Sequence, residues 1–408
     1  MQLALLHDRL REAFFRWGWL TPAALPLSQL GGRGLFNTLV SLYALWGLSS
    51  LWSRRDRLDP SLVWPYLTLL SVFLLTIPGT VDPVGGLRAW IGFALQSSAL
   101  LLTLVALRES PTHADRLLNV MALLGALMLG GLYVLLLYYL LGASGQAFDP
   151  VLQLREDNLP FLLPFLLGWL WRRSASRWRY AAMAGVTGLV LAYVVLAEGR
   201  AALLGLIVGL VVFGGLTLKW RIRWVAGLAA LILALGVAVN IGPFLKAELD
   251  PARPLDAFTA GRTALWRQAL ANPPAQPWLG VGMGNGAHAS EVLQFQLGGQ
   301  THQVRHLHNF LLDAWYETGW LGLSALIALI GSVLFRLART WRQLSTEDRQ
   351  RAGVWLAAAF ALMTAGLLSF SYTSRQLSCY LFFCLGGLSD LSRSAKPPTG
   401  CDTAPDRR

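Results

Sequence analysis

Long apolar runs separated by short polar turns dominate the pattern of this chain. We interpret eleven runs as helices that cross a bilayer, for which a typical span has about 20 residues, although the run at 159–171 is short and contains Pro160 and Pro164. They cover about 36–52, 62–78, 89–107, 117–141, 159–171, 180–197, 201–218, 224–243, 319–337, 353–371 and 376–391. The pattern therefore predicts an all-α, polytopic bundle of transmembrane helices.

A weaker candidate span lies at about 13–30, where four residues interrupt the apolar pattern: Arg16, Pro22, Pro26 and Gln29. This stretch is either a further span or an amphipathic helix at the membrane surface. Four basic residues precede residue 36 and favour a cytoplasmic N-terminus. We therefore expect about twelve spans, with both ends of the chain in the cytoplasm.

Lysine and arginine are distributed unequally between the two sides of these spans. One alternating set of turns, together with the C-terminal tail, holds 21 of the 34 basic residues, whereas the opposite set holds nine. Cytoplasmic loops of membrane proteins carry the excess of Lys and Arg, so the first set is predicted to be cytoplasmic. The net charge of +12 thus reflects topology, and no nucleic-acid partner is expected.

The composition agrees with a membrane protein, since 55% of residues are apolar and only 14% are charged. Such a low charged fraction excludes a disordered chain and an ordinary cytosolic enzyme. Two of the three cysteines, Cys379 and Cys384, lie in an apolar run, and Cys401 lies in the tail, so no disulfide framework is expected. Residues 1–11 lack the pattern of a cleavable signal.

One connection is far longer than the others, and it divides the chain into four parts. These are N-terminal transmembrane helices at 1–243, an external loop at 244–318, C-terminal transmembrane helices at 319–392 and a cytoplasmic tail at 393–408. Long loops in compact proteins are usually functional or disordered. Because the loop contains Trp266 and Trp278, we expect it to be folded, with helices at 259–270 and 302–317.

External arginines are candidates for chemistry because positive charge on that side runs against the topology rule. Arg200 lies in a tight external turn between two apolar spans, and a guanidinium near hydrocarbon often marks a site. Its alternative roles are pairing with Glu198 or reaching toward lipid headgroups. Arg262 and the nearby Arg267 lie on the expected loop helix, where each alone is also typical of a solvated charge.

Four of the six histidines lie in the external loop: His288, His302, His306 and His308. On a helix, His302 and His306 would lie one turn apart, which is a spacing that permits zinc. No cysteine is nearby and the carboxylates are not arranged as further ligands, so we expect no metal and no cofactor. The competing hypothesis is a single histidine that acts as a general base near neutral pH.

The glycine-rich segment 280–286 also needs an interpretation. It follows no predicted strand and lies outside the cytoplasm, so it is not expected to bind a nucleotide. We expect a turn that lets the main chain approach a ligand closely.

Several motifs occur together between residues 199 and 322. Residues 308–322 carry His-Asn, then Leu, then Glu-x-Gly-x-x-Gly at the start of a predicted span. Gly-Arg occurs at 199–200 and again at 261–262, where Trp266 follows, and Gly-x-Gly-x-Gly occupies 280–284. With the single large external loop, this pattern resembles the O-antigen ligase/polymerase superfamily.

The resemblance implies glycosyl transfer from an undecaprenyl-pyrophosphate-linked glycan on the periplasmic side of a bacterial inner membrane. In O-antigen ligases, the acceptor is a sugar hydroxyl of the lipid A–core oligosaccharide. The functional residues of the family are two external arginines and the loop histidine, which match Arg200, Arg262 and His308 here. Further candidates for substrate binding are Arg267, Arg305, Asn309 and Glu317, of which Asn309 and Glu317 could instead orient their neighbours.

The chemistry suits these residue types. Arginine forks bind pyrophosphate oxygens without a metal, and a neutral imidazole can accept the proton of the attacking hydroxyl. Direct attack predicts inversion at the anomeric carbon. Because both substrates are lipid-linked, we expect a cavity between loop and bundle that opens laterally to the bilayer.

Three alternatives share some of these features. An O-antigen polymerase would use the same donor with a lipid-linked glycan as acceptor, but such polymerases tend to carry two substantial external loops. Protein O-oligosaccharyltransferases are usually longer, with an extra external domain after the last spans. A transporter would place ionisable residues in mid-span, and these spans are nearly free of them. The sequence therefore favours the ligase.

Overall fold

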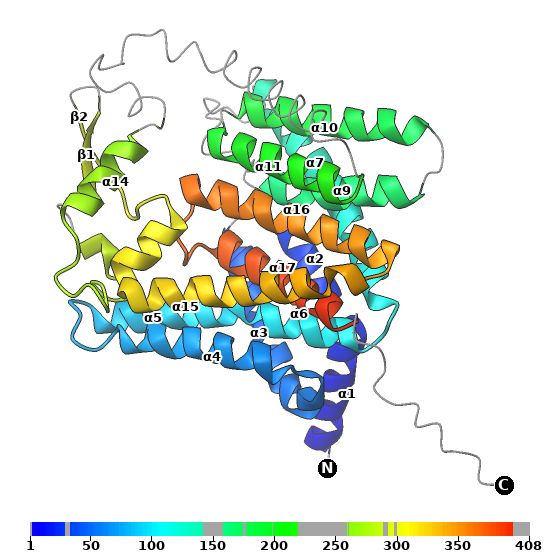
Figure 1. The fold of residues 1–408 in the computed structure, drawn as a ribbon, viewed down its shortest axis with the longest axis horizontal. Helices are drawn as coiled ribbons and strands as arrows, with labels where there is room; N and C mark the ends of the chain where they lie inside the picture. The colour runs from blue at the N-terminus through cyan, green and yellow to red at the C-terminus, as the bar shows by residue number, and fades with distance from the viewer. Residues whose placement is uncertain are drawn as a thin grey trace.

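The computed structural model describes residues 2–28, 33–141, 158–173, 177–197, 199–218, 259, 261–288, 293–297 and 300–394. Most of these residues are helical, and long helices run side by side along the longest axis of the molecule (Figure 1). The predicted all-α membrane fold is confirmed. The expected span at 224–243 and the tail at 395–408 lie outside the described residues.

The N-terminal half contains α1 (Gln2–Trp17), α2 (Leu20–Ser28), α3 (Arg33–Leu51), η2 (Trp52–Arg57), α4 (Pro60–Leu75), α5 (Pro83–Ser97), α6 (Ala99–Arg108), α7 (His113–Leu140), α9 (Leu159–Arg173), α10 (Trp178–Leu196) and α11 (Arg200–Leu216). The C-terminal half contains α14 (Arg262–Ala271), η4 (Gly286–His288), β1 (Gln294–Leu297), β2 (Gln300–Gln303), α15 (Phe310–Thr340), η5 (Trp341–Gln343), α16 (Thr346–Ser369) and α17 (Arg375–Ser394).

Six described helical segments are long and apolar enough to cross a membrane: Gly34–Arg57, Pro83–Arg108, His113–Leu140, Trp178–Leu196, Phe310–Gln343 and Thr346–Ser369. Two shorter apolar helices, α4 and α11, lie among them. Within the described residues, the apolar runs thus correspond to helices, whereas a total of about twelve spans remains a prediction.

The weak candidate at 13–30 is not one continuous span. Helix α1 ends at Trp17 and α2 begins at Leu20, with a turn at Gly18 between them. A Cβ atom on Gly18 would lie 2.5 Å from the Phe14 carbonyl oxygen, which explains why a glycine occupies this turn. The nine residues of α2 extend only about 14 Å, less than the ~30 Å hydrocarbon thickness of a bilayer.

Helix α16 lies at the centre of the bundle, where it packs on α9, α11, α15 and α17. Its contact with α11 depends on small residues, since a Cβ on Gly205 would lie 2.6 Å from the Ala361 carbonyl oxygen. Farther along α11, Thr217 lies beside Gly353, so the two helices are antiparallel. Continued to the start of α11, this register places Arg200 level with the last turn of α16.

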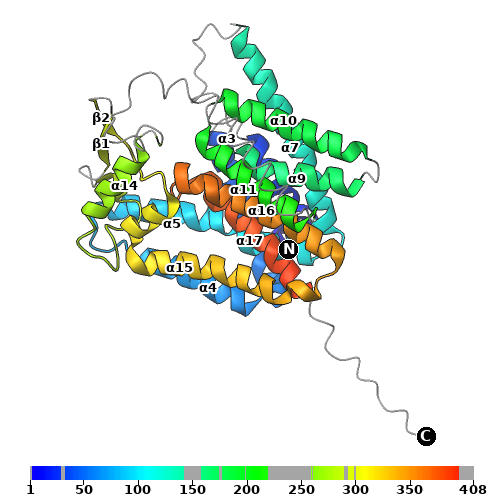
Figure 2. The ribbon, with the colours of Figure 1, turned by 45° about the horizontal axis from the view of Figure 1, so that its top comes forward.

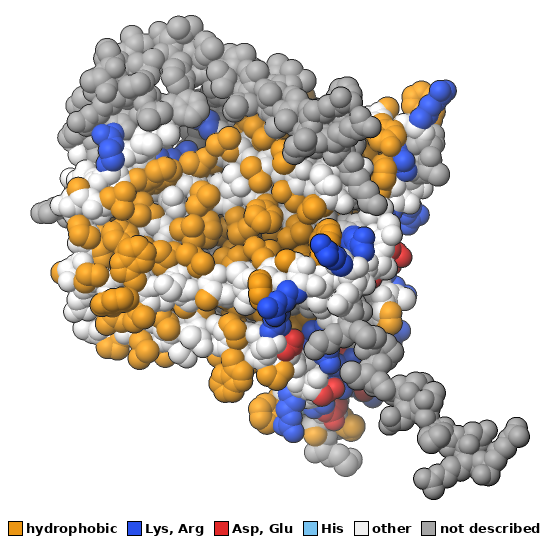
Figure 3. All heavy atoms as spheres, in the orientation of Figure 1, with side chains coloured by type: hydrophobic (Ala, Val, Ile, Leu, Met, Phe, Trp, Pro, Cys, Tyr) orange, Lys and Arg blue, Asp and Glu red, His pale blue; other side chains and the backbone are white. Residues whose placement is uncertain are grey.

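The two ends of the bundle differ in character. We call the end that contains Arg57, Arg108, Asp115, Arg172 and Arg351 the arginine-rich end. Contacts between these residues join η2 to α6, and α7 to both α9 and α16. The opposite end, the site end, carries α14, the β1–β2 hairpin and the start of α15 (Figures 1 and 2). Figure 3 shows hydrophobic side chains spread over the surface between the two ends, as a lipid-facing surface requires.

The described part of the loop 244–318 has its own small core, formed by Leu265, Ala269, Leu293, Leu307, Trp315 and Tyr316. The expected loop helix is present as α14, which begins at Arg262 after Gly261 adopts φ 79°. The β1–β2 hairpin pairs antiparallel and was not predicted.

The expected helix 302–317 is wrong in its first half. Residues 300–303 form β2, and the helix begins only at Phe310. The physical reason is the cap, because the Asn309 side chain accepts hydrogen bonds from the main-chain N–H groups of Leu311 and Leu312, both at 3.1 Å. A carboxamide in this position ends the preceding loop and starts the helix.

Candidate active site

Helix α15 is broken at Gly319, which has φ 65°. At the break, main-chain groups of the helix bond to the glycine-rich segment instead of to each other. The N–H groups of Val281 and Gly282 donate to the carbonyls of Tyr316 and Glu317 at 3.0 and 2.8 Å. A Cβ on Gly319 would lie 2.2 Å from the carbonyl carbon of Trp278, so this glycine does more than permit helix packing. The break falls at the predicted boundary between loop and span.

The Glu317 carboxylate is buried and holds the glycine-rich segment from inside. Its Oε2 accepts from Gly284 N at 2.8 Å and from the Tyr372 hydroxyl at 2.7 Å, and its Oε1 accepts from Gly286 N at 3.0 Å. A Cβ on Gly286 would lie only 2.6 Å from Oε1. The close main-chain approach expected at 280–286 is therefore made to a side chain of the protein itself.

A second buried carboxylate, Asp313, fixes the segment that carries the candidate histidine. Its Oδ1 accepts from Leu307 N at 3.1 Å, and its Oδ2 accepts from the Ser371 hydroxyl. Asn309 caps the same helix, and its main-chain carbonyl accepts from Asp313 N at 2.8 Å. Residues 307–309 are thus held between α15 and the turn that joins α16 to α17.

His308 adopts φ 52°, the one positive φ of a non-glycine residue in the described part of the chain. A conformation of this kind costs on the order of 1–3 kcal/mol and clusters at functional sites. The His308 Nδ1 atom lies 3.3 Å from the Ser369 carbonyl oxygen. A carbonyl can only accept, so Nδ1 carries the proton in this contact, and Nε2 keeps its lone pair. His308 is therefore set up to accept a proton at Nε2.

His306 lies directly against His308. Their ring centroids are 4.2 Å apart, and His306 Nδ1 accepts the main-chain N–H of His308 at 3.2 Å. The pKa of His308 is lowered to about 3, chiefly by burial and also by the neighbouring His306 and Arg262. Burial and Arg262 also lower the pKa of His306. Both rings are neutral at pH 7, beside a permanent cation.

Arg262 is the first residue of α14, a partly buried position. One turn later, Trp266 Nε1 donates to the Leu307 carbonyl at 2.7 Å and so ties α14 to the histidine segment. Arg200 lies at the same end of the bundle, because the α11–α16 register places it level with the turn that ends at Ser369. The structure thus brings Arg262 and His308 together and puts Arg200 at the same level.

The remaining site candidates occupy different environments. Arg267 and Arg305 are exposed, and Arg267 Nε donates to the Thr263 carbonyl of its own helix at 3.3 Å. Asn309 and Glu317 make the internal contacts described above. Substrate binding by these four residues remains a prediction.

The possible zinc spacing of His302 and His306 depended on a helix that does not form. His302 lies on β2, and His306 lies in the segment that follows this strand. Among the described residues, no three His, Cys, Asp or Glu side chains come together as potential ligands of one ion.

Residues 185–327 match the family model of the O-antigen ligase. This segment includes Arg200, Arg262, the two histidines and the break in α15. Over these residues, the chain is similar to the O-antigen ligase family. The resemblance seen in the motifs is confirmed, and this match together with the apolar helices implies a multi-pass membrane protein.

A relative is the exopolysaccharide production protein ExoQ of Rhizobium meliloti (strain 1021), which is 28% identical over 189 residues. The match covers 43% of this chain and 40% of the relative. The match with this chain thus spans less than half of the length of the relative.

The sequence did not single out every residue that shapes the site. His306 was considered only as a possible zinc ligand, although the His-x-His pattern at 306–308 could have suggested two rings that touch. Ser369, Ser371 and Tyr372 belong to no motif. They contribute a carbonyl and two hydroxyls from the turn after α16, and only the folded chain brings them to the loop.

Proposed function

We propose that this protein is an O-antigen ligase, which transfers a glycan from undecaprenyl pyrophosphate to a sugar hydroxyl of lipid A–core oligosaccharide. The reaction would take place on the periplasmic face of a bacterial inner membrane, because the site end lies opposite the arginine-rich end. The observation that carries the proposal is the contact of two neutral histidines beside Arg262, in a matched O-antigen ligase domain.

In the proposed reaction, the acceptor oxygen forms a bond to the anomeric carbon as the bond from that carbon to the pyrophosphate oxygen breaks. The leaving group departs with the electron pair as undecaprenyl pyrophosphate. Arg200 and Arg262 bind its phosphate oxygens, and guanidinium–phosphate pairs stabilise the charge that develops there. The acceptor proton moves to His308 Nε2, and one displacement inverts the anomeric carbon.

The low pKa of His308 fits this sequence of events. A histidine with a pKa of about 3 is a weak base while the site is empty. A bound pyrophosphate would place negative charge near the ring, and an opposite charge raises the pKa of an imidazole. His308 would therefore become basic only when the donor is in place.

A second candidate function is polymerisation, with the same donor and a lipid-linked glycan as acceptor. The relative that is named for exopolysaccharide production favours this candidate. The residues at the reacting centre would keep the same roles, because only the acceptor differs.

The test is glycan transfer by the purified full chain in detergent, with EDTA present. The assay supplies an undecaprenyl-pyrophosphate glycan and lipid A–core as acceptor. A ladder of high-mass lipopolysaccharide that His308→Ala reduces about 10²–10⁴-fold is expected, since general bases contribute this much. His288→Ala, an exposed loop histidine, serves as the matched control. Lengthening of the lipid-linked glycan alone would identify a polymerase, and full activity of His308→Ala would exclude the base role.

A further inference from the structure

The His306 side chain does two things that the reaction proposed above does not use. It accepts the main-chain N–H of the residue two positions later, and its ring lies against the ring of that residue. Both contacts are made to His308, the residue with the unusual φ of 52°.

The hydrogen bond fixes the protonation pattern of His306. Its Nδ1 accepts, so in the neutral ring the proton is on Nε2. His308 has the opposite tautomer, because its Nδ1 faces the Ser369 carbonyl at 3.3 Å. The two touching rings therefore differ in which nitrogen carries the proton.

The same hydrogen bond explains how His308 keeps its main-chain conformation. A non-glycine residue leaves the left-handed region readily unless its surroundings hold it there. Here the N–H that this conformation exposes is bonded to His306, Leu307 N is bonded to Asp313, and the next residue caps α15. Of these three restraints, the bond to His306 is the one made to His308 itself.

We propose that His306 is a positioning residue for His308: its Nδ1 holds the His308 main chain at positive φ, so that the His308 ring meets the Ser369 carbonyl and keeps a lone pair on Nε2. This inference rests on the proposed function only in one respect, namely that His308 Nε2 accepts the proton of the attacking hydroxyl. Without His306, the His308 main chain relaxes, the contact with Ser369 is lost, and the ring samples both tautomers.

Three substitutions separate positioning from other roles. His306→Asn keeps an acceptor oxygen near the place of Nδ1, His306→Gln moves the amide one bond farther toward the place of Nε2, and His306→Ala has no acceptor. The full chain in detergent, with ¹⁵N-labelled histidine, reports the tautomer of His308 through the ring nitrogen shifts. A spectrum of His308→Gln identifies the His308 signals among the six histidines.

We expect the wild type and His306→Asn to show His308 protonated on Nδ1. His306→Ala and His306→Gln are expected to show a mixture of tautomers and a kcat for glycan transfer about 10–100-fold lower, with KM nearly unchanged, because misplacement by about 1 Å can cost 10²-fold. His288→Ala, a loop histidine outside this contact, is the control and leaves both readouts unchanged. If His306→Ala does not fold, the difference between the Asn and Gln variants still tests the positioning role of His306.

Two results would overturn the positioning role. One is a His306→Ala variant with the wild-type tautomer of His308 and the wild-type kcat. The other is an equal loss of kcat and of the Nδ1 tautomer in the Asn and Gln variants. Failure of the proposed function looks different, because the wild type would then transfer no glycan while the tautomer of His308 still responded to His306.

Discussion

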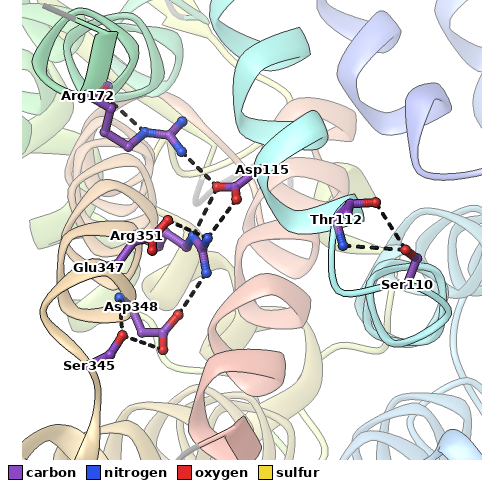
Figure 4. A network of polar contacts seen from close by, with 9 residues as sticks. Ser110, Thr112, Asp115, Arg172, Ser345, Glu347, Asp348 and Arg351 are labelled. Carbon is purple, nitrogen blue, oxygen red and sulfur yellow. Dashed lines mark hydrogen bonds and ion pairs between the residues drawn. The ribbon is translucent and has the colours of Figure 1, made fainter.

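The two ends of the bundle use the same charged residue types in opposite ways. At the arginine-rich end, Asp115 on α7 accepts from Arg172 of α9 at 2.9 Å and from Arg351 of α16 at 2.7 Å (Figure 4). Arg351 also pairs with Glu347 and Asp348 on its own helix. Here carboxylates neutralise guanidinium groups, and the result is a link between three helices.

At the site end, the buried carboxylates have main-chain and hydroxyl partners instead. Asp313 and Glu317 shape the segments at 307–309 and 280–286, while the charge of Arg262 acts on two neutral histidines. The comparison predicts that arginines at one end stabilise the fold, whereas Arg200 and Arg262 at the other end act on a ligand in the proposed reaction. Substitutions at the two ends should therefore affect different measurements.

The largest effect on activity is expected when Arg262 or Arg200 is substituted. Arg262→Lys and Arg200→Lys keep the charge but lose the fork that binds phosphate oxygens in pairs. We expect each to lower kcat for glycan transfer about 10²–10³-fold, the usual effect of one lost donor to a developing anion. Arg88→Lys, at an exposed position on α5, is the control. Equal losses of kcat in all three variants would mean that Arg200 and Arg262 have no special role in the reaction.

Glu317→Gln tests the carboxylates of the site end. One amide oxygen and one NH₂ would replace two acceptor oxygens that now receive three hydrogen bonds. The expected loss in free energy of unfolding is about 1–3 kcal/mol, because a buried donor would face another donor. Thermal unfolding in detergent measures it, with the exposed Glu347→Gln as the control. A Glu317→Gln variant as stable as the control would contradict the conclusion that the Glu317 carboxylate holds the segment 280–286 in place.

The histidines predict how stability depends on pH. The pKa of His308 is about 3 in the fold and near 6.5 in the unfolded chain, so the unfolded state binds more protons between these values. Stability therefore falls as the pH decreases below 6.5, by about 1–2 kcal/mol between pH 7 and pH 5 for this residue. Unfolding midpoints across this range, compared with His308→Asn, measure the effect. A variant with the slope of the wild type would refute the prediction.

The smallest effect is expected at the arginine-rich end. Asp115→Asn weakens the link to Arg172 and Arg351, but the Asp115 side chain is 39% exposed and solvent screens its charge. We expect a loss in stability of at most about 1 kcal/mol, with kcat for glycan transfer unchanged. A large loss of kcat with normal stability would mean that this end takes part in the reaction.

The sequence predicted the long helices well, because a bilayer requires continuous apolar runs and the runs are visible without any tertiary contact. The predicted boundary between loop and span coincides with Gly319, the glycine where α15 breaks, and the place where the membrane begins stays a prediction. The late start of α15 was predictable in principle, since Asn309 directly precedes an apolar run and has the position of a helix cap.

Other features of the site depend on contacts that no local pattern shows. The acceptor for His308 Nδ1 is the main-chain carbonyl of Ser369, 61 residues later, and any residue type could supply it. Strands β1 and β2 have no clear alternation of apolar and polar residues, so the hairpin forms through pairing and through its contact with α14. Sequence motifs therefore pointed to the candidate side chains Arg200, Arg262 and His308, but not to the parts of the fold that hold them in place.

The break at Gly319 also limits how far His308 can lie from the surface of the membrane. If the hydrocarbon begins at this residue, the nine helical residues before it rise at most about 14 Å above the boundary, at 1.5 Å per residue, and His308 lies two residues beyond them. The polar headgroup layer of a bilayer leaflet accounts for about half of that distance. In the proposed reaction, the reacting carbon of a polyprenyl-linked sugar would thus meet the histidine just above the headgroups, while the polyprenyl chain stays in the bilayer.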